Sequence, residues 1–269
     1  MRKDLKKLES KLLELKNTGR LLAIKAEFEA EGTRIDELGI LSNACFKNNV
    51  PLTLKIGGPA AIRDIYEAFQ LGASKILIPM VESEYSLKYF IDFYKKFSTD
   101  FQGLNEDTKL AINIESKLGY KNINNIIEAI RNNSLPIADL VIGRTDLSSS
   151  LQISNVNSQE ILKITKDIIS KSLIHNLKST LGGNLSTDSF GFINELKNYK
   201  LYAFESRKVT FKFSKSPSKK EFDALIKLSL EFELAWLDFK RSMYSLRSNE
   251  ENARVSIIKN RLSISNRND

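Results

Sequence analysis

The segment of residues 52–83, LTLKIGGPAAIRDIYEAFQLGASKILIPMVES, contains two apolar runs separated by an amphipathic stretch. The runs LTLKI and KILIPMV have the length and composition of buried strands. Between them, apolar residues recur at the i, i+3, i+4 spacing of one helix face, at Ala61, Ile62, Ile65, Ala68 and Phe69. The segment therefore predicts a strand, a helix and a second strand, the βα unit that builds parallel sheets.

The same alternation extends in both directions along the chain. Further strands are expected at residues 21–29, 109–115, 138–143, 177–182 and 201–206, with helices at 34–48, 86–97, 123–132, 157–174 and 187–198. These strands are mostly apolar and are expected to be buried, as in parallel sheets. Seven strands can be placed in this way, and an eighth cannot.

Two α/β architectures suit this order, a closed (β/α)8 TIM barrel and an open doubly wound sheet. The fingerprint G-x-G-x-x-G is absent after the first strand, which disfavours a dinucleotide-binding sheet. The chain of 269 residues matches a barrel of about 250 residues. We predict an N-terminal helix over 1–20, a (β/α)8 barrel over 21–216, and a long C-terminal helical segment over 217–269.

The positive charge of the chain is confined to three stretches. The net charge is +8, and residues 1–20, 206–220 and 240–269 together carry +14, so the remainder carries about −6. A nucleic-acid role is therefore disfavoured, and its only support is the basic run 206–220. We expect a cytoplasmic protein, because no apolar block resembles a secretory signal or a membrane span. One cysteine and one histidine exclude an internal disulfide and a site of several imidazoles.

Polar residues gather where the predicted strands end, which is where barrel enzymes carry their chemistry. The residues in question are Glu27, Glu29, Glu31, Lys55, Glu115, Gly143, Arg144, Asp146, Glu205, Arg207 and Lys208. Carboxylates without imidazole or thiol suit a hard cation such as Mg²⁺ or Mn²⁺. Glu115 and Asp146 form the best pair, and salt bridges across the barrel mouth are the alternative. Lys55 has three candidate roles: anion binding, Schiff-base formation, or pairing with Glu29 or Glu115.

Two blocks carry a family resemblance, residues 52–83 quoted above and residues 111–151, AINIESKLGYKNINNIIEAIRNNSLPIADLVIGRTDLSSSL. Together they resemble the HpcH/HpaI aldolase and citrate lyase β-subunit superfamily, in which a strand ends in Glu and a later one in G-P-x-D-L-S. The resemblance implies a (β/α)8 barrel that binds a divalent metal and an oxo acid such as pyruvate. It implies Glu115 and Asp146 as metal ligands. It also implies a last helix exchanged between subunits of a homo-oligomer.

The chain departs from the family pattern at three positions. Ala30 stands where the family has a proton-transferring histidine, Lys55 where it has an arginine, and Arg144 where it has a proline. We therefore predict a divergent metal-dependent carbon–carbon lyase for an oxo acid or a phosphorylated substrate. Glu29 or Glu27 would be the base, assisted by Lys55.

In this prediction the substrate contacts come from Lys55, Gly143, Arg144 and Arg207. The alternative is a catalytically altered barrel that serves as a binding or regulatory protein. A polyanion-binding role through 206–220 is the third possibility.

Overall fold

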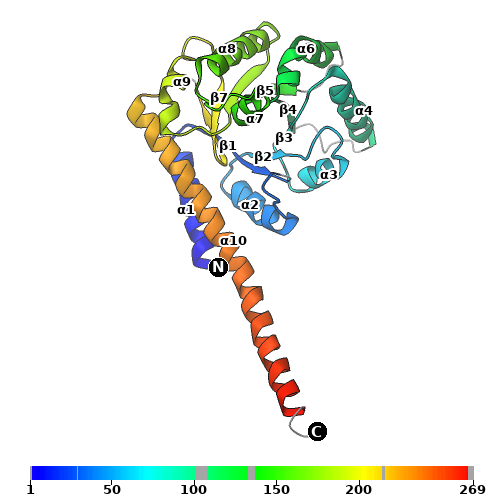
Figure 1. Cartoon of the computed structure of the whole chain (residues 1–269), viewed down its shortest axis with the longest axis vertical. Helices are drawn as coiled ribbons and strands as arrows, with labels where there is room; N and C mark the ends of the chain where they lie inside the picture. Colours follow the sequence, from blue (N-terminus) through cyan, green and yellow to red (C-terminus); the bar gives the residue numbers. More distant parts are fainter. Residues whose placement is uncertain (1, 29, 101–107, 133–136, 214–215, 266–269) are drawn as a thin grey trace.

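The computed structural model describes residues 2–28, 30–100, 108–132, 137–213 and 216–265 (Figure 1). Within them, strands in sequence order form a closed eight-stranded barrel, which confirms the predicted fold class. The strands are β1 (Leu21–Glu27), β2 (Leu52–Lys55), β3 (Lys75–Ile78), β4 (Lys109–Ile114), β5 (Ile137–Gly143), β6 (Lys178–Gly182), β7 (Ala203–Ser206) and β8 (Val209–Lys212). Neighbouring strands from β1 to β7 are parallel.

The eighth strand closes the barrel in the opposite direction. β8 pairs antiparallel with both β7 and β1, and a two-residue turn of Arg207 and Lys208 joins it to β7. No helix intervenes, so this last unit is a hairpin and not a βα unit. The sequence conceals it because the strand VTFK lies inside the basic run that begins at Arg207.

Helices cover the outside of the barrel. The larger ones are α2 (Ile35–Lys47), α3 (Ile62–Gln70), α4 (Glu84–Asp100), α6 (Ile123–Asn132) and α8 (Gln159–Ile174). Shorter elements follow β4, β5 and β6, namely α5 (Lys117–Lys121), α7 (Arg144–Ser150), η1 (Thr187–Ser189) and α9 (Phe190–Asn194). The main core lies between strands and helices, and it includes the one cysteine of the chain, Cys45. The one histidine of the chain, His175, is the C-cap of α8.

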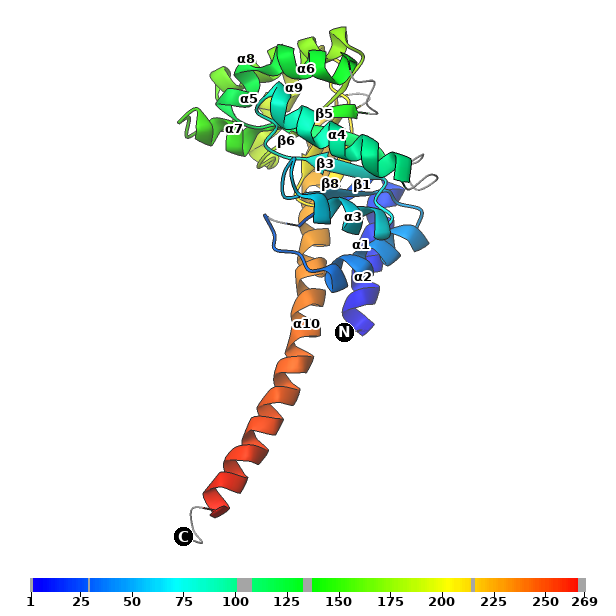
Figure 2. The same ribbon diagram turned by 90° about the vertical axis from the view of Figure 1, so that its right-hand side faces the viewer.

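Two helices from the chain termini pack together beside the barrel. α1 (Arg2–Asn17) lies along the first half of α10 (Lys219–Ser265), as both views show (Figures 1 and 2). Leu8, Leu12 and Leu15 bury one face of α1, and Lys7 pairs with Asp238 at 3.0 Å. The second half of α10 projects away from the barrel. Among the described helices, none is long and apolar enough to cross a bilayer.

The interior of the barrel is unusually polar. A small apolar cluster of Leu77, Ala111 and Val141 is separate from the main core. The remaining buried side chains around the axis are mostly charged or hydroxylated, and they include Lys25, Thr53, Asn113, Asp139, Thr180, Glu205 and Thr210. TIM barrels usually fill this space with branched apolar residues. Here the polar axis leaves a cavity at each end.

Candidate functional site

The cavity at the C-terminal ends of the strands collects most of the polar residues predicted from the sequence. It has a volume of about 230 Å³, and its charged lining consists of Lys25, Glu27, Lys55, Glu115, Asp146, Glu205 and Arg207. Glycines at 143, 182 and 183 line it as well. A neighbouring hollow of about 380 Å³ shares Glu27, Lys55, Glu115 and Asp146. The strand ends therefore converge on one mouth, as expected.

Glu115 is buried at the end of β4 and held in place by two hydrogen bonds. Its Oε1 accepts from the backbone N–H of Met80 at 3.0 Å, and its Oε2 accepts from Asn113 Nδ2 at 2.8 Å. Gly143 provides the space, because a Cβ there would lie 2.7 Å from the Cβ of Glu115. Burial raises the pKa of Glu115 despite the attraction of Lys55, and the negative charge of Asp146 raises it further.

Asp146 stands in the first turn of α7, exposed to solvent at the same mouth. It forms no hydrogen bond or ion pair with the described part of the chain. It lines the same two hollows as Glu115, so the two carboxylates face the same region. The carboxyl pair expected from the sequence is therefore brought together.

The remaining charges of the mouth alternate in sign. Lys55 Nζ lies 3.8 Å from Glu115 Oε2 and 3.9 Å from Glu27 Oε2. Lys25 Nζ lies 3.1 Å from Glu27 Oε1 and 2.9 Å from Glu205 Oε2. Burial raises the pKa of Glu27, but Lys25 and Lys55 outweigh it, and the net pKa is below its ordinary value. Glu27 is therefore ionised at neutral pH, whereas Glu29 lies outside the described residues.

Arg144 does not reach into this cavity. Its side chain is fully buried and donates to the carbonyls of Gly182 at 3.2 Å and Gly183 at 2.7 Å, and to Asn157 Oδ1 at 2.8 Å. The guanidinium also lies 4.6 Å from the ring centre of Phe192. The substrate contact expected of Arg144 is replaced by a structural one, because its donors are directed at backbone acceptors. Arg144 fixes the Gly182–Gly183 loop against α7.

The basic run 206–220 begins inside the fold. Arg207 lines the mouth, but its guanidinium pairs with Glu233 of α10, with Nη2 2.8 Å from Oε1. Lys208 is buried and pairs with Glu31. These two cations are therefore neutralised within the chain. A polyanion surface built from this run loses two of its six basic residues.

Two site residues were not predicted from the sequence, Lys25 and Asn113. Each lies two positions before a predicted carboxylate, Glu27 and Glu115 respectively. Alternate residues of a strand share a face, so both side chains point into the barrel with those carboxylates. A polar residue at this spacing within an apolar strand is the signal that identifies them.

The donor set suits a divalent cation held by few protein ligands. Within the described residues, no group of three or more His, Cys, Asp and Glu could hold a metal. Glu115 and Asp146 supply two carboxylates, and the nearby Asn113 Oδ1 is buried without a hydrogen-bond partner among the described residues. Mg²⁺ is commonly bound by one or two carboxylates, with substrate oxygens and water completing the shell. These residues fit such a cation.

The barrel is similar to known proteins both in sequence and in structure. Residues 54–179 match the model of the HpcH/HpaI aldolase/citrate lyase family. An HpcH/HpaI aldolase from Desulfitobacterium hafniense DCB-2 has a TM-score of 0.56 at 13% identity, over 70% of this chain and 78% of that one. The citrate synthase SbnG has a TM-score of 0.55 at 16% identity, over 68% and 75% respectively. RipC from Yersinia pestis has a TM-score of 0.52 at 16% identity, over 75% and 87%. No curated protein sequence matches the chain.

The fold and the site together place the protein among the α/β barrels that carry a charged cavity at the C-terminal ends of their strands. Residues 54–179 match an HpcH/HpaI aldolase/citrate lyase domain, and structures of that family share the fold of the barrel. This match supports an enzyme of the lyase type.

Proposed function

We propose that this protein is a divalent-metal-dependent carbon–carbon lyase of the aldolase type, acting on an oxo acid. The observation that carries the proposal is the carboxylate pair of Glu115 and Asp146 facing one cavity beside the ammonium group of Lys55. A cation and a cationic side chain next to each other suit a small substrate that carries both a carbonyl oxygen and a carboxylate.

In this proposal Glu115 and Asp146 would hold Mg²⁺ or Mn²⁺. A divalent cation bound there would supply the positive charge that polarises an oxo group and stabilises an enolate. Glu115 is positioned for this role before any ligand arrives, since Met80 and Asn113 fix both of its oxygens.

Lys55 binds the substrate carboxylate or phosphate, and Glu27 moves the proton. Lys55 Nζ lies almost equally far from Glu27 and Glu115, so an anion beside it is near both carboxylates. Glu27 remains ionised because Lys25 and Lys55 lower its pKa, so it can accept a proton from the substrate carbon. Glu29 is the alternative base. Gly143 and Arg207 line the cavity and complete the proposed substrate site.

The alternative function, ligand binding without turnover, has one observation in its favour. Ala30 lines the cavity at the position that corresponds to the family histidine, so no imidazole is available there. The proposed lyase therefore depends on a carboxylate base.

Proton exchange at pyruvate separates the two functions. In deuterated buffer with Mn²⁺ or Mg²⁺, we expect the wild-type protein to exchange the methyl protons of pyruvate, followed by proton NMR. Glu27→Gln should slow the exchange by about 10²–10⁴-fold, the usual contribution of a general base. Glu195→Gln, an exposed carboxylate paired with Lys166 at 3.2 Å, is the control and should exchange normally.

Oxalate, an enolate mimic, supplies the second measurement. Stabilisation of the wild-type protein by Mn²⁺ plus oxalate without any pyruvate exchange would contradict the lyase and support the binding protein. At one hundred times its dissociation constant, a ligand of the native state adds about 2.7 kcal/mol to the free energy of unfolding. If the wild-type protein neither exchanged the protons of pyruvate nor were stabilised by Mn²⁺ plus oxalate, both the lyase and the oxo-acid-binding protein would be contradicted.

We also propose that the protein is a homo-oligomer joined through α10. Apolar side chains of this helix remain largely exposed at Leu230, Leu234, Leu237, Leu246, Val255, Ile257 and Ile258. A projecting helix with this many exposed apolar groups gains stability from a second copy. Sedimentation equilibrium should give a mass that is a multiple of 30.5 kDa, and a monomer would contradict this part of the proposal.

A further inference from the structure

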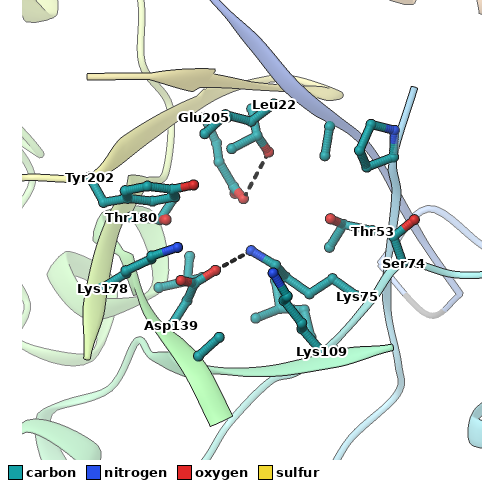
Figure 3. Close-up of a pocket in the computed structure, with 16 residues that line it drawn as sticks. Leu22, Thr53, Ser74, Lys75, Lys109, Asp139, Lys178, Thr180, Tyr202 and Glu205 are labelled. Carbon is teal, nitrogen blue, oxygen red and sulfur yellow. Dashed lines mark hydrogen bonds and ion pairs between the residues drawn. The ribbon is translucent and has the colours of Figure 1, made fainter. Parts of the chain in front are cut away.

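A second cavity lies at the opposite end of the barrel, where the strands begin (Figure 3). Its volume is about 260 Å³, smaller than a pocket for a drug-sized ligand. Glu205 and Val141 line both cavities, so they separate this one from the C-terminal mouth. The sequence offers no family role for this end of the barrel.

Three lysines from three different strands converge on this cavity. Lys75 begins β3, Lys109 begins β4 and Lys178 begins β6, and their amino groups point toward its centre (Figure 3). Asp139 is the acid that faces them, and it pairs with Lys75. The other acidic group, Glu205, is already bound to Lys25. Positive charge is therefore in excess around the cavity, which favours an anionic ligand.

The charges outside the cavity have the same sign. Lys178 Nζ lies 4.3 Å from the ring centre of Tyr202, and these two residues also line an adjoining groove. That groove contains Lys197, Lys200 and Lys212. A basic approach to a basic cavity raises the local concentration of small anions.

Asp139 specifies what kind of anion fits. The residue is fully buried, and its Oδ1 has no hydrogen-bond partner among the described residues. A buried carboxylate oxygen without a donor is costly. The ligand therefore needs negative charge for the lysines and an O–H group for Asp139. Thr53 and Thr180, both buried in the lining, add hydroxyl groups.

We propose that the N-terminal cavity is a binding site for a protonated phosphate group, either inorganic phosphate or a small phosphate monoester. Lys75, Lys109 and Lys178 bind its oxygens, and Asp139 Oδ1 accepts a hydrogen bond from its O–H group. Sulfate has the same shape but carries no proton at neutral pH, so it meets the Asp139 carboxylate without a hydrogen bond. The site therefore discriminates phosphate from sulfate.

Titration calorimetry of the full chain with inorganic phosphate tests the proposal. We expect saturable binding to the wild type, and about tenfold or greater weakening in the double variant Lys109→Gln/Lys178→Gln, since two charge-assisted hydrogen bonds are lost. Both lysines are exposed at the rim, so the fold is retained. The control Lys47→Gln/Lys163→Gln removes two exposed lysines outside the cavity and should bind normally.

Two further titrations examine the chemistry and the source of the ligand. Sulfate should bind the wild type about tenfold or more weakly than phosphate, and Asp139→Asn should reduce that preference. Glycerol phosphate binding as tightly as inorganic phosphate would identify a monoester as the ligand class.

Three results would overturn the proposal. They are no phosphate binding to the wild type, unchanged binding to the lysine double variant, and loss of binding in Lys55→Gln, which would place the anion at the C-terminal mouth. A negative result for phosphate would not bear on the proposed lyase. Lys109, Lys178 and Asp139 do not line the C-terminal cavity, so the pyruvate exchange tests that function independently.

Discussion

Lys25→Met is expected to lower the free energy of unfolding by about 3–5 kcal/mol, the usual cost of removing one partner from a buried ion pair. Lys25 Nζ lies within 3.1 Å of both Glu27 and Glu205, and all three side chains are largely buried. Methionine fills a similar volume, so the loss reports the two carboxylates left without their cation. Urea unfolding followed by circular dichroism measures the effect.

The effect of Lys25→Met should depend on pH with a definite sign. Lys25 helps to hold the pKa of Glu27 below its ordinary value of 4.5. A carboxyl whose pKa is lowered by folding stabilises the protein above that ordinary value, and the stabilisation is lost as the pH falls through the lowered pKa. The difference between wild type and variant should therefore be largest near neutral pH and shrink below about 4.5.

A surface pair provides the control for Lys25. Lys166→Met breaks the pair with the exposed Glu195 and should change stability by less than about 1 kcal/mol. Equal losses of stability in the two variants would contradict the buried ion pairs of Lys25 with Glu27 and Glu205. A loss for Lys25→Met that does not vary with pH would contradict them as well.

Arg144→Ala is expected to cost about 3 kcal/mol or more and to weaken ligand binding at the C-terminal mouth. The substitution leaves the carbonyls of Gly182 and Gly183 and the side chain of Asn157 without their buried donor, and each unsatisfied group costs about 1–3 kcal/mol. Gly183 would then be free to move from its close contact with α7, where a Cβ would lie 2.5 Å from the N of Thr145. Denaturant unfolding and oxalate binding in the presence of Mn²⁺ measure the two effects.

Arg63→Ala is the matched control for Arg144. Its side chain is 83% exposed and forms a long i,i+4 contact with Glu67, so we expect a change within about 0.5 kcal/mol. If Arg144→Ala remained as stable as Arg63→Ala and bound oxalate normally, Arg144 would not fix the glycine loop.

Much of the candidate site could be predicted because parallel strands place their C-terminal ends together. Glu27, Lys55, Glu115 and Asp146 are far apart in sequence and line one cavity for this reason. Sequence position does not tell where a long side chain ends. Arg144 follows a strand as a substrate-binding residue would, yet its neighbours supply backbone acceptors and its guanidinium turns away from the cavity.

Two other features escaped prediction for different physical reasons. Lys25 and Asn113 lie within strands and not at their ends, so a search of strand ends misses them although they share a face with Glu27 and Glu115. β8 was missed because its four residues follow a charged two-residue turn, and its direction is set by pairing with β1 and β7. Local pattern does not determine pairing of this kind.

Direct titration with Mn²⁺, followed by the loss of the free-ion signal in electron paramagnetic resonance, tests the proposed metal centre most directly. We expect one Mn²⁺ to bind per wild-type chain. Glu115→Gln and Asp146→Asn should each weaken Mn²⁺ binding by about 10–100-fold or more, because loss of a residue that only hydrogen-bonds to a metal ligand already costs about that much affinity. Asp36→Asn, an exposed carboxylate paired with Arg34 at 3.0 Å, is the control and should bind Mn²⁺ like the wild type. Failure of the wild-type chain to bind Mn²⁺, or equal affinity in the Glu115 and Asp146 variants, would contradict the metal centre and with it the proposed lyase.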